Sequence, residues 1–372
     1  MRITYPFLKT VFLSISLSLL SCARPAVPYD NPVIAHDCPD PTVLDNRARD
    51  GFFYAYSTRI RVDSVMYEIP VYRSVDLVNW ERVGAAFTSV SRPSWEEKGV
   101  LWAPDINYVN GKYVLYYAMG VWGDHDRSAS GVAVADSPTG PFKDLGMLVS
   151  KANTGVGNSI DPNYFEDTDG KKYLYWGSLS HPKDAEAGRK PGIFVVELTE
   201  DGLSLKPGSE PVKVAGDRME GTYVHKRGKY YYLFASEGSC CNGGESTYHI
   251  VVGRSKSPLG PFVSQTGVPM IAGDEGIFDG IILSRDAEDV FCGPGHNAEI
   301  ITDDRGHDWM PYHSYWKGTG YKGRCMNLDR VFWTRDGWPY FENGTPSATS
   351  AKSPYLRRGS RSAGRRLSGK RN

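Results

Sequence analysis

The stretch from Asp161 to Trp176 reads Asp-Pro-Asn-Tyr-Phe-Glu-Asp-Thr-Asp-Gly-Lys-Lys-Tyr-Leu-Tyr-Trp, and its pattern is the clearest indication of the fold. An acidic residue opens a short aromatic run, an Asp-Gly turn follows, and a second aromatic run comes after the turn. Short runs of aromatic and β-branched residues divided by Gly turns predict two antiparallel strands joined as a hairpin. A helix is excluded because the runs are short and broken by Gly and Pro.

The same pattern occurs five times along the chain. The other four copies open at Asp40, at Ala103-Pro104-Asp105, at Glu220 and at His296. Later strands also recur, since Ser137–Phe142 and Ser257–Phe262 both read Ser-Pro-x-Gly-Pro-Phe. Repeated units of a few short strands are typical of propeller blades. The sequence therefore predicts an all-β, five-bladed β-propeller over residues 31–346.

The repeat also predicts the position of an active site. The first strand of a propeller blade lies against the central channel, so the residues that open the repeats meet at its mouth. Asp40, Asp161 and Glu220 should converge there although they are far apart in sequence. Carboxyl groups held together repel one another, and their pKa values separate in a way that suits acid–base chemistry. The alternative is that each carboxylate only accepts hydrogen bonds from the amides of its own turn. This explanation would be sufficient for one blade, but it is less satisfactory for three acids that converge.

The charges of the chain argue against nucleic acid as a partner. The sequence has 43 basic and 43 acidic residues, but eight of the bases and no acid lie in residues 352–372. Arg2 and Lys9 belong to the N-terminal leader. The body of the chain, between the leader and the basic tail, therefore has 33 basic residues and all 43 acidic residues. Nucleic-acid binding needs a basic face, which this body lacks. We expect the basic tail, residues 347–372, to be disordered.

The N-terminus predicts export. The apolar run Val11–Leu20 is too short to cross a bilayer as a helix, and residues 1–21 have the form of a signal peptide. The run ends in Leu19-Leu20-Ser21-Cys22, which resembles the lipobox of bacterial lipoproteins. That resemblance implies a lipidated Cys22, a linker over residues 22–30 and anchoring in the cell envelope, on the periplasmic or surface face of the outer membrane. An ordinary signal peptide with an incidental Cys is the alternative.

Three motifs in order resemble glycoside hydrolase family 43. They are Asp37–Val43, Ser159–Asn163 and Met219–Tyr223. The resemblance implies that Asp40 is the general base, that Glu220 is the general acid, and that Asp161 tunes the pKa of the acid and orients it. Asp37 is the nearby alternative for the base. All three acids are present, whereas a non-catalytic sugar-binding propeller predicts the loss of one.

Other stretches resemble arabinan endo-1,5-α-L-arabinosidases. They are Leu101–Asp105, the Cys-Cys segment Gly238–Gly243 and the segment Gly293–Asn297. The resemblance implies a monomer that hydrolyses α-1,5-L-arabinofuranosidic bonds of arabinan with inversion. It also implies that His296 faces a calcium or other ion on the axis, held mostly by water. Substrate contacts are implied for three residues: Trp102, Asn158 and Ser178.

Two departures leave the exact linkage and cleavage position open. His36 stands three residues earlier than the His that often precedes the base, and the polar loop Ser180–Pro191 is long. An exo-acting α-L-arabinofuranosidase or β-xylosidase of the same family therefore remains an alternative, and a cleft blocked at one end would favour it. Apart from Cys22 the chain has five cysteines, an odd number without a CxxC spacing. One disulfide fits an oxidising envelope, with partners that the sequence does not select, and we interpret Cys240-Cys241 as structural.

Overall fold

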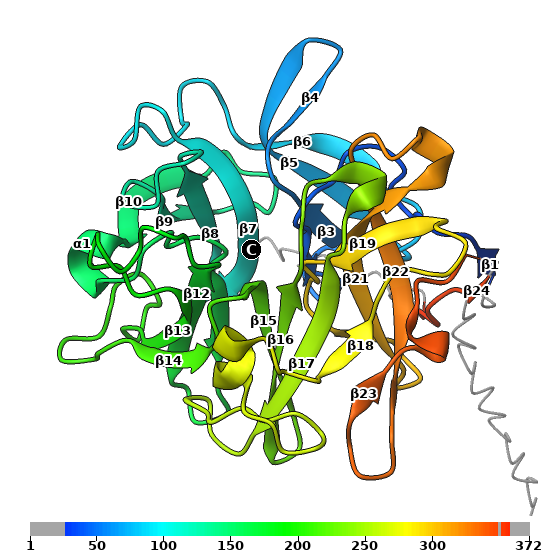
Figure 1. Ribbon diagram of the computed structural model, residues 1–372. Helices are drawn as coiled ribbons and strands as arrows, with labels where there is room; N and C mark the ends of the chain where they lie inside the picture. Colours follow the sequence, from blue (N-terminus) through cyan, green and yellow to red (C-terminus); the bar gives the residue numbers. More distant parts are fainter. Residues whose placement is uncertain (1–26, 349–350, 358–372) are drawn as a thin grey trace, which may run out of the picture.

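The computed structural model describes residues 27–348 and 351–357. The predicted signal peptide, Cys22 and the tail from residue 358 lie outside these residues. Five antiparallel sheets stand around a central axis (Figure 1). This arrangement confirms the predicted all-β, five-bladed β-propeller. Within the described residues, no helix is both long enough and apolar enough to cross a membrane.

Each blade is built from strands that follow one another outward from the axis. The first blade contains β2 (Thr42–Asp45), β3 (Phe53–Tyr56), β5 (Val65–Ser74) and β6 (Glu81–Phe87), with β4 (Ile60–Val62) paired to β5. The second contains β7 (Val100–Val109), β8 (Lys112–Gly120), β9 (Ala129–Ala135) and β10 (Lys143–Val149), and the third contains β11 (Asn163–Glu166), β12 (Lys172–Ser178), β13 (Gly192–Glu197) and β14 (Val212–Ala215). The fourth contains β15 (Met219–Arg227), β16 (Tyr230–Glu237), β17 (His249–Ser255) and β18 (Ile281–Leu283), and the fifth contains β19 (Phe291–Gly295), β21 (Asp308–Trp316), β22 (Arg324–Trp333) and β23 (Pro339–Tyr340), with β20 (Ile301–Thr302) paired to β21.

Within residues 27–348 and 351–357, helical segments are few and short. They are α1 (Lys151–Thr154) and the 3-10 turns η1 (Gly243–Glu245), η2 (Met270–Glu275), η3 (Lys317–Thr319) and η4 (Glu342–Gly344).

The strand β8 shows why the aromatic runs of the sequence become blade strands. Side chains alternate between the two faces of a strand. Leu115 and Tyr117 pack with the first blade, whereas Val114 and Tyr116 pack with the third. Both faces are therefore buried, which requires a continuous apolar run. The turn before β8 uses Asn110 and Gly111 at positive φ (48° and 85°), as a tight hairpin with type I′ geometry demands.

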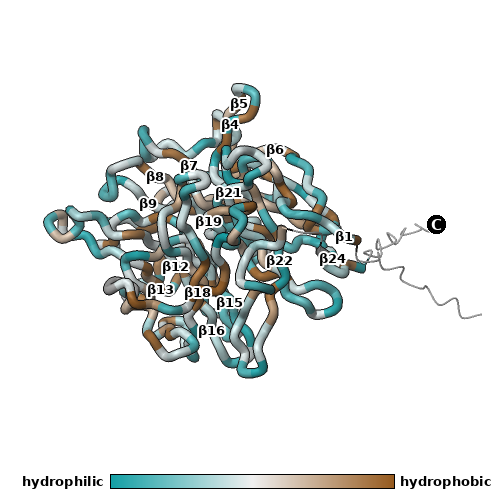
Figure 2. The backbone as a smooth tube through the Cα atoms, turned by 45° about the vertical axis from the view of Figure 1, so that its right-hand side comes forward, coloured by the Kyte–Doolittle hydropathy of each residue, from teal (hydrophilic) through white to brown (hydrophobic). Residues whose placement is uncertain are grey.

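The ring closes where the fifth blade meets the first. Ile34 pairs with Met326 of β22, and the side chain of Asn31 accepts a hydrogen bond from the amide of Leu328 (2.9 Å). Outside the predicted bounds of the propeller, β1 (Pro28–Tyr29) pairs with β24 (Ala351–Lys352). Figures 1 and 2 both place this small sheet at the edge of the molecule.

The structure thus differs from the expected boundaries at both ends. Part of the tail that we expected to be disordered is bound to the fifth blade. The amide of Tyr355 donates to Asp303 (3.1 Å), the amide of Arg357 donates to Asp304 (2.6 Å), and the Arg305 guanidinium lies 3.8 Å from the centre of the Tyr355 ring. These contacts join segments about fifty residues apart, which local composition does not reveal.

Candidate active site

The five repeats share one backbone feature at the mouth of the channel. A residue with positive φ lies just before, within or just after the innermost strand of each blade: Asp40 (51°), Ala103 (35°), Asp161 (56°), Gly221 (61°) and His296 (43°). This conformation is unfavourable for residues with a side chain, and it clusters at functional sites. The pattern shows that Ala103 is the equivalent of Asp40. Asp105 lies two residues further along its strand.

Asp40 lies in a pocket of hydrogen-bond donors. Its Oδ1 is 2.7 Å from Nη1 of Arg324, 3.2 Å from Nδ1 of His313 and 3.3 Å from Nδ1 of His296. Its Oδ2 accepts a hydrogen bond from the hydroxyl of Thr58 at 2.6 Å. Burial by itself would raise the pKa of Asp40, but the Arg324 guanidinium overcomes it. The pKa therefore lies well below its usual value, and Asp40 is ionised.

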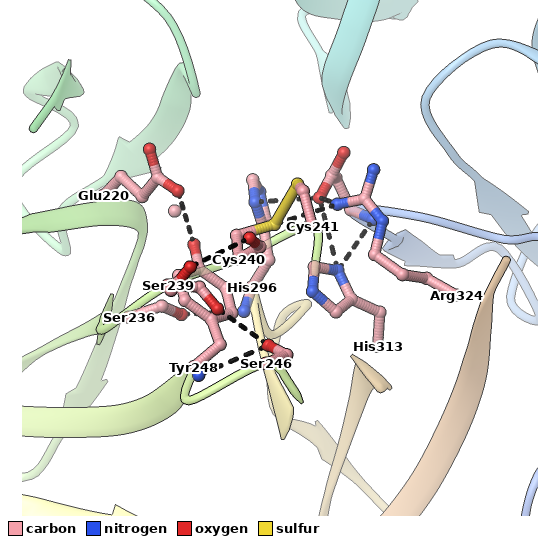
Figure 3. The surroundings of a disulfide bond; sticks show 12 residues. Glu220, Ser236, Ser239, Cys240, Cys241, Ser246, Tyr248, His296, His313 and Arg324 are labelled. Atoms are coloured by element: carbon pink, nitrogen blue, oxygen red, sulfur yellow. Dashed lines mark hydrogen bonds and ion pairs between the residues drawn. A yellow bond between two sulfur atoms is a disulfide. The ribbon is translucent and has the colours of Figure 1, made fainter. Parts of the chain in front are cut away.

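The charge that holds Asp40 ionised comes from Arg324. Burial lowers the pKa of His313 to about 4 and also lowers that of His296, so both imidazoles are neutral near pH 7. The amide of Asp40 donates to Nδ1 of His313 at 3.1 Å. A neutral ring that accepts this bond presents a lone pair at Nδ1 and adds little attraction for the Asp40 carboxylate. Figure 3 shows Arg324, His313 and His296 gathered on one side of the site.

Glu220 and Asp161 occupy a different environment. Glu220 accepts hydrogen bonds from the hydroxyls of Ser178 (2.7 Å) and Tyr248 (3.0 Å), and Asp161 accepts one from the amide of Gly221 (3.0 Å). In the described part of the chain, neither carboxyl group forms an ion pair. Burial raises the pKa of both groups, and repulsion from Asp40 adds to this effect for each of them. Asp161 also feels Glu220 directly, so the two groups are best satisfied when they share one proton.

The arrangement supplies an acid and a base at once. Asp40 is ionised at the pH at which the Glu220–Asp161 pair keeps a proton. A pair of carboxyl groups whose pKa values are pushed apart in one cleft is the requirement for general acid–base cleavage of a glycosidic bond.

Trp102 lies beside the base. The residue after it, Ala103, donates its amide hydrogen to the same Thr58 hydroxyl that contacts Asp40 (2.8 Å). The Trp102 ring is 5.0 Å from the ring of Trp122, whose side chain is 77% exposed. A Cβ at position 120 would lie 1.7 Å from the Trp102 ring, so Gly120 makes room for it. Sequence analysis missed Trp122, because it lies in a loop and not in a repeated motif.

The structure places the remaining predicted residues as follows. Asn158 is half-buried with positive φ (47°), and its amide donates to the carbonyl of His125 (2.8 Å). The hydroxyl of Ser178 contacts Glu220, so it acts on the acid. Asp37 accepts a hydrogen bond from the amide of Arg324 (2.8 Å) and thereby supports the cation that pairs with Asp40.

Several functional side chains escaped sequence analysis. Arg324 begins β22 and has no equivalent in the other repeats. His313 and Tyr248 lie in stretches that were recognised only as strand or family motif. Asp105 is also notable, because burial raises its pKa to about 6. It binds Tyr223 (2.6 Å) and the amide of Tyr164 (2.6 Å), so it joins three blades below the site.

The channel was tested for an ion site. In the described residues no three His, Cys, Asp or Glu side chains form a metal-binding group. Nδ1 of His296 faces Asp40, and the buried oxygens Oγ1 of Thr222 and Oδ1 of Asn297 lack a hydrogen-bond partner among the residues described. Neutral oxygens and one imidazole fit an ion held mostly by water, and they do not fit a cage of protein ligands. No chemical step below depends on an ion.

A five-bladed propeller with an ionised carboxylate opposite a protonated carboxyl pair has the fold and the site of an acid–base glycoside hydrolase. The comparison with known families agrees. The chain belongs to the glycosyl hydrolases family 43, whose sequence model matches residues 29–339.

Individual relatives are similar over most of the chain. An extracellular exo-α-(1→5)-L-arabinofuranosidase of Cellvibrio japonicus is 32% identical over 287 residues, covering 73% of this chain and 79% of the relative. An extracellular endo-α-(1→5)-L-arabinanase of Bacillus subtilis is 29% identical over 353 residues, covering 81% and 69%. The solved structure of a Cellvibrio cellulosa α-L-arabinanase complexed with arabinohexaose has a TM-score of 0.69 at 28% identity, covering 82% of this chain and 96% of that one.

Proposed function

We propose that the protein hydrolyses α-1,5-L-arabinofuranosidic bonds of arabinan with inversion of configuration. The observation that carries the proposal is that the pKa of Asp40 is lowered, by Arg324, whereas the pKa of the neighbouring Glu220 is raised, by burial and by repulsion from Asp40. The substrate class is supported by the relatives, which are described as acting on α-1,5-linked arabinofuranose chains, and by the arabinohexaose bound to the Cellvibrio cellulosa enzyme.

The chemistry follows from the two protonation states. Glu220 donates its proton to the glycosidic oxygen as the bond to the anomeric carbon breaks. Asp40 accepts a proton from a water molecule as the water oxygen bonds to that carbon from the opposite side. Inversion requires room for this water, so the two carboxyl groups of such enzymes are about 6.5–9.5 Å apart. Burial and repulsion from Asp40 raise the pKa of Glu220. We propose that Asp161, which is coupled to Glu220, helps to keep this pKa raised, and that its bond to the amide of Gly221 orients the acid.

The sugar is held by side chains around these groups. The exposed ring of Trp122, packed edge-on against the half-buried Trp102, offers an apolar surface for a sugar ring. Asn158, three residues before Asp161, is the proposed polar contact. Proton NMR of the first product tests the reaction as a whole: the anomeric configuration should be opposite to that of the substrate. Retention would assign Asp40 the role of nucleophile instead.

We propose internal cleavage of the arabinan chain as the finer activity. The Cys-Cys and axial His motifs support it, because they resemble those of endo-acting enzymes. Exo-action is the second candidate, favoured by the Cellvibrio japonicus relative. Products from linear arabinan, branched arabinan and xylan separate these candidates. Early mixed oligosaccharides support endo-action, and arabinose alone from the first time point supports exo-action.

We also propose that the protein is a monomer, that it is exported, and that a lipid on Cys22 anchors it in the cell envelope. The relatives described as extracellular support export. The variant Cys22→Ser should be released from membranes and should not incorporate a labelled fatty acid. Continued labelling would contradict the anchor.

An ion on the axis, held mostly by water beside His296, is a further proposal. The unpartnered oxygens of Thr222 and Asn297 support it. Anomalous diffraction from crystals soaked in calcium should reveal a peak beside His296, and a featureless axis would contradict the proposal. With His296→Ala the peak should disappear.

A further inference from the structure

The disulfide found in the described residues joins two neighbours in the chain. Cys240 and Cys241 are bonded in the loop between β16 and β17, whereas Cys38, Cys292 and Cys325 are buried thiols. A disulfide stabilises a fold mainly by closing a long loop of the unfolded chain. A bond between adjacent residues closes almost no loop, so global stabilisation does not account for it.

The loop that carries the disulfide contacts both halves of the active site. Sγ of Cys240 lies 3.7 Å from Nη1 of Arg324, and the same nitrogen lies 2.7 Å from Oδ1 of Asp40. At the end of the loop, the hydroxyl of Tyr248 donates to Oε1 of Glu220 at 3.0 Å. Figure 3 shows the two sulfur atoms between Arg324 on one side and the Tyr248–Glu220 pair on the other.

The backbone of this loop is held in a constrained form. Cys241 has positive φ (65°), a conformation that is unfavourable for a residue with a side chain. The ring that the disulfide closes through the peptide between the two cysteines restricts both residues. Nearby, the hydroxyl of Ser246 donates to the carbonyl of Ser239 (2.8 Å) and joins the two sides of the loop. Without the ring, Cys241 is no longer held in the left-handed region, and Sγ of Cys240, which lies beside Arg324, is no longer tied to it.

We propose that the Cys240–Cys241 disulfide is a positioning group of the active site, which holds the Arg324 guanidinium against Asp40 and makes hydrolysis sensitive to dithiol reductants. The inference rests on the proposed function. Reduction transfers two electrons and two protons from the dithiol: the S–S bond of the protein breaks, two cysteine thiols form, and the reductant closes its own disulfide. Cys241 is exposed and Cys240 is half-buried, so a small reductant reaches the bond.

The test compares kcat and KM on an aryl α-L-arabinofuranoside and on linear arabinan, before and after treatment with dithiothreitol. We expect reduction to lower kcat about tenfold and to leave KM within about twofold, because the disulfide acts through the base and not through ground-state binding. The double variant Cys240→Ser/Cys241→Ser should show the same loss without reductant. If the disulfide were purely structural, its reduction would change the melting temperature and would not lower kcat selectively relative to KM.

Two controls make the route through Arg324 testable. In Arg324→Lys the loss on reduction should fall below about twofold, since coupled residues are not additive. Cys292→Ser should respond to the reductant as the unmodified protein does, because its thiol is buried outside the disulfide. An unchanged kcat after titration of two new thiols per molecule would overturn the inference. An equal loss in the Arg324→Lys background would overturn it too.

A structural measurement separates this inference from the proposed function. A crystal structure of the double serine variant should show the Arg324 guanidinium displaced from Asp40. An unchanged Arg324–Asp40 contact would overturn the inference whether or not the protein cleaves arabinan. Absence of hydrolysis by the untreated protein would instead count against the proposed function, and the crystal structure would still decide the role of the disulfide.

Discussion

The pocket around Asp40 and the pocket around Asp161 and Glu220 contain the same kind of group in nearly the same degree of burial. Asp40 is 8% exposed and Asp161 is 7% exposed, and both begin from positive φ at the start of an innermost strand. Their pKa values nevertheless move in opposite directions. Burial cannot explain the difference, because it raises the pKa of both.

The difference is the cation. Arg324 reaches Asp40 from the fifth blade, whereas in the described residues the Glu220–Asp161 pair receives only hydroxyl and amide donors. A buried carboxyl group beside a guanidinium stays ionised, and one beside another carboxyl group keeps a proton. One long side chain therefore accounts for the opposite pKa shifts of the two pockets.

Removing the base should have the largest effect. Asp40→Asn leaves the shape and abolishes the proton acceptor, so kcat/KM should fall by about 10³–10⁴ on natural and aryl substrates alike. Azide, a small anion that needs no general base, should restore part of the activity. Full activity of Asp40→Asn would show that another residue is the general base. Asp37 is the nearest candidate, and the matched variant Asp37→Asn tests whether it has this role.

Removing the acid should have an effect that depends on the leaving group. Glu220→Gln should lower kcat/KM by about 10²–10⁴ on arabinan, where the leaving oxygen needs a proton. An aryl glycoside with a good leaving group needs less protonation and should lose much less. Equal losses on the two substrates would contradict the assignment of Glu220 as the proton donor.

Removing the cation should make the two pockets alike. In Arg324→Met, burial raises the pKa of Asp40 and the strongest opposing group is gone, so the base loses its charge at a higher pH. The acidic limb of the kcat/KM profile should move to higher pH by about one unit or more. The alkaline limb, which reports the acid, should move much less. An unmoved acidic limb would show that the histidines, and not Arg324, hold Asp40 ionised.

Changing the partner of the acid should have the opposite sign. Asp161→Asn removes a repelling carboxyl group, so the pKa of Glu220 falls and the acid loses its proton at lower pH. The alkaline limb of the profile should then move to lower pH, by up to about one unit. Asp105→Asn is a useful control, because Asp105 is buried below the site and should leave that limb in place. A shift to higher pH in Asp161→Asn would contradict the sharing of a proton.

The smallest effect is expected at the aromatic surface next to the base. Trp122→Ala should raise KM a fewfold and change kcat little, since a lost stacking contact is worth about 0.5–1.5 kcal/mol. The exposed Val90 provides a control, because Val90→Ala removes apolar surface at a site that is 93% exposed. Equal KM values for Trp122→Ala and the unmodified protein would remove Trp122 from the substrate surface.

The five-bladed architecture and the convergence of Asp40, Asp161 and Glu220 could be predicted from the sequence. Each repeat carries its own turns and its own aromatic strands, so the blade is encoded locally, and propeller geometry then requires Asp40, Asp161 and Glu220 to share one channel mouth. The roles suggested for these acids came from motifs that are equally local. The aromatic run of β8 likewise predicted a strand, because a strand covered on both faces has no polar side.

The groups that shift the pKa of each acid became visible in the three-dimensional structure alone. Arg324 lies 284 positions from Asp40 along the chain and has no counterpart in the other repeats, so no local pattern announces their contact. The bond between Cys240 and Cys241, the burial of Ser178 beside Glu220 and the exposure of Trp122 were also invisible in the sequence. The physical reason is common to all of them: a pKa, a disulfide partner and an exposed ring depend on what neighbouring blades bring within a few ångströms, and the repeat does not specify that.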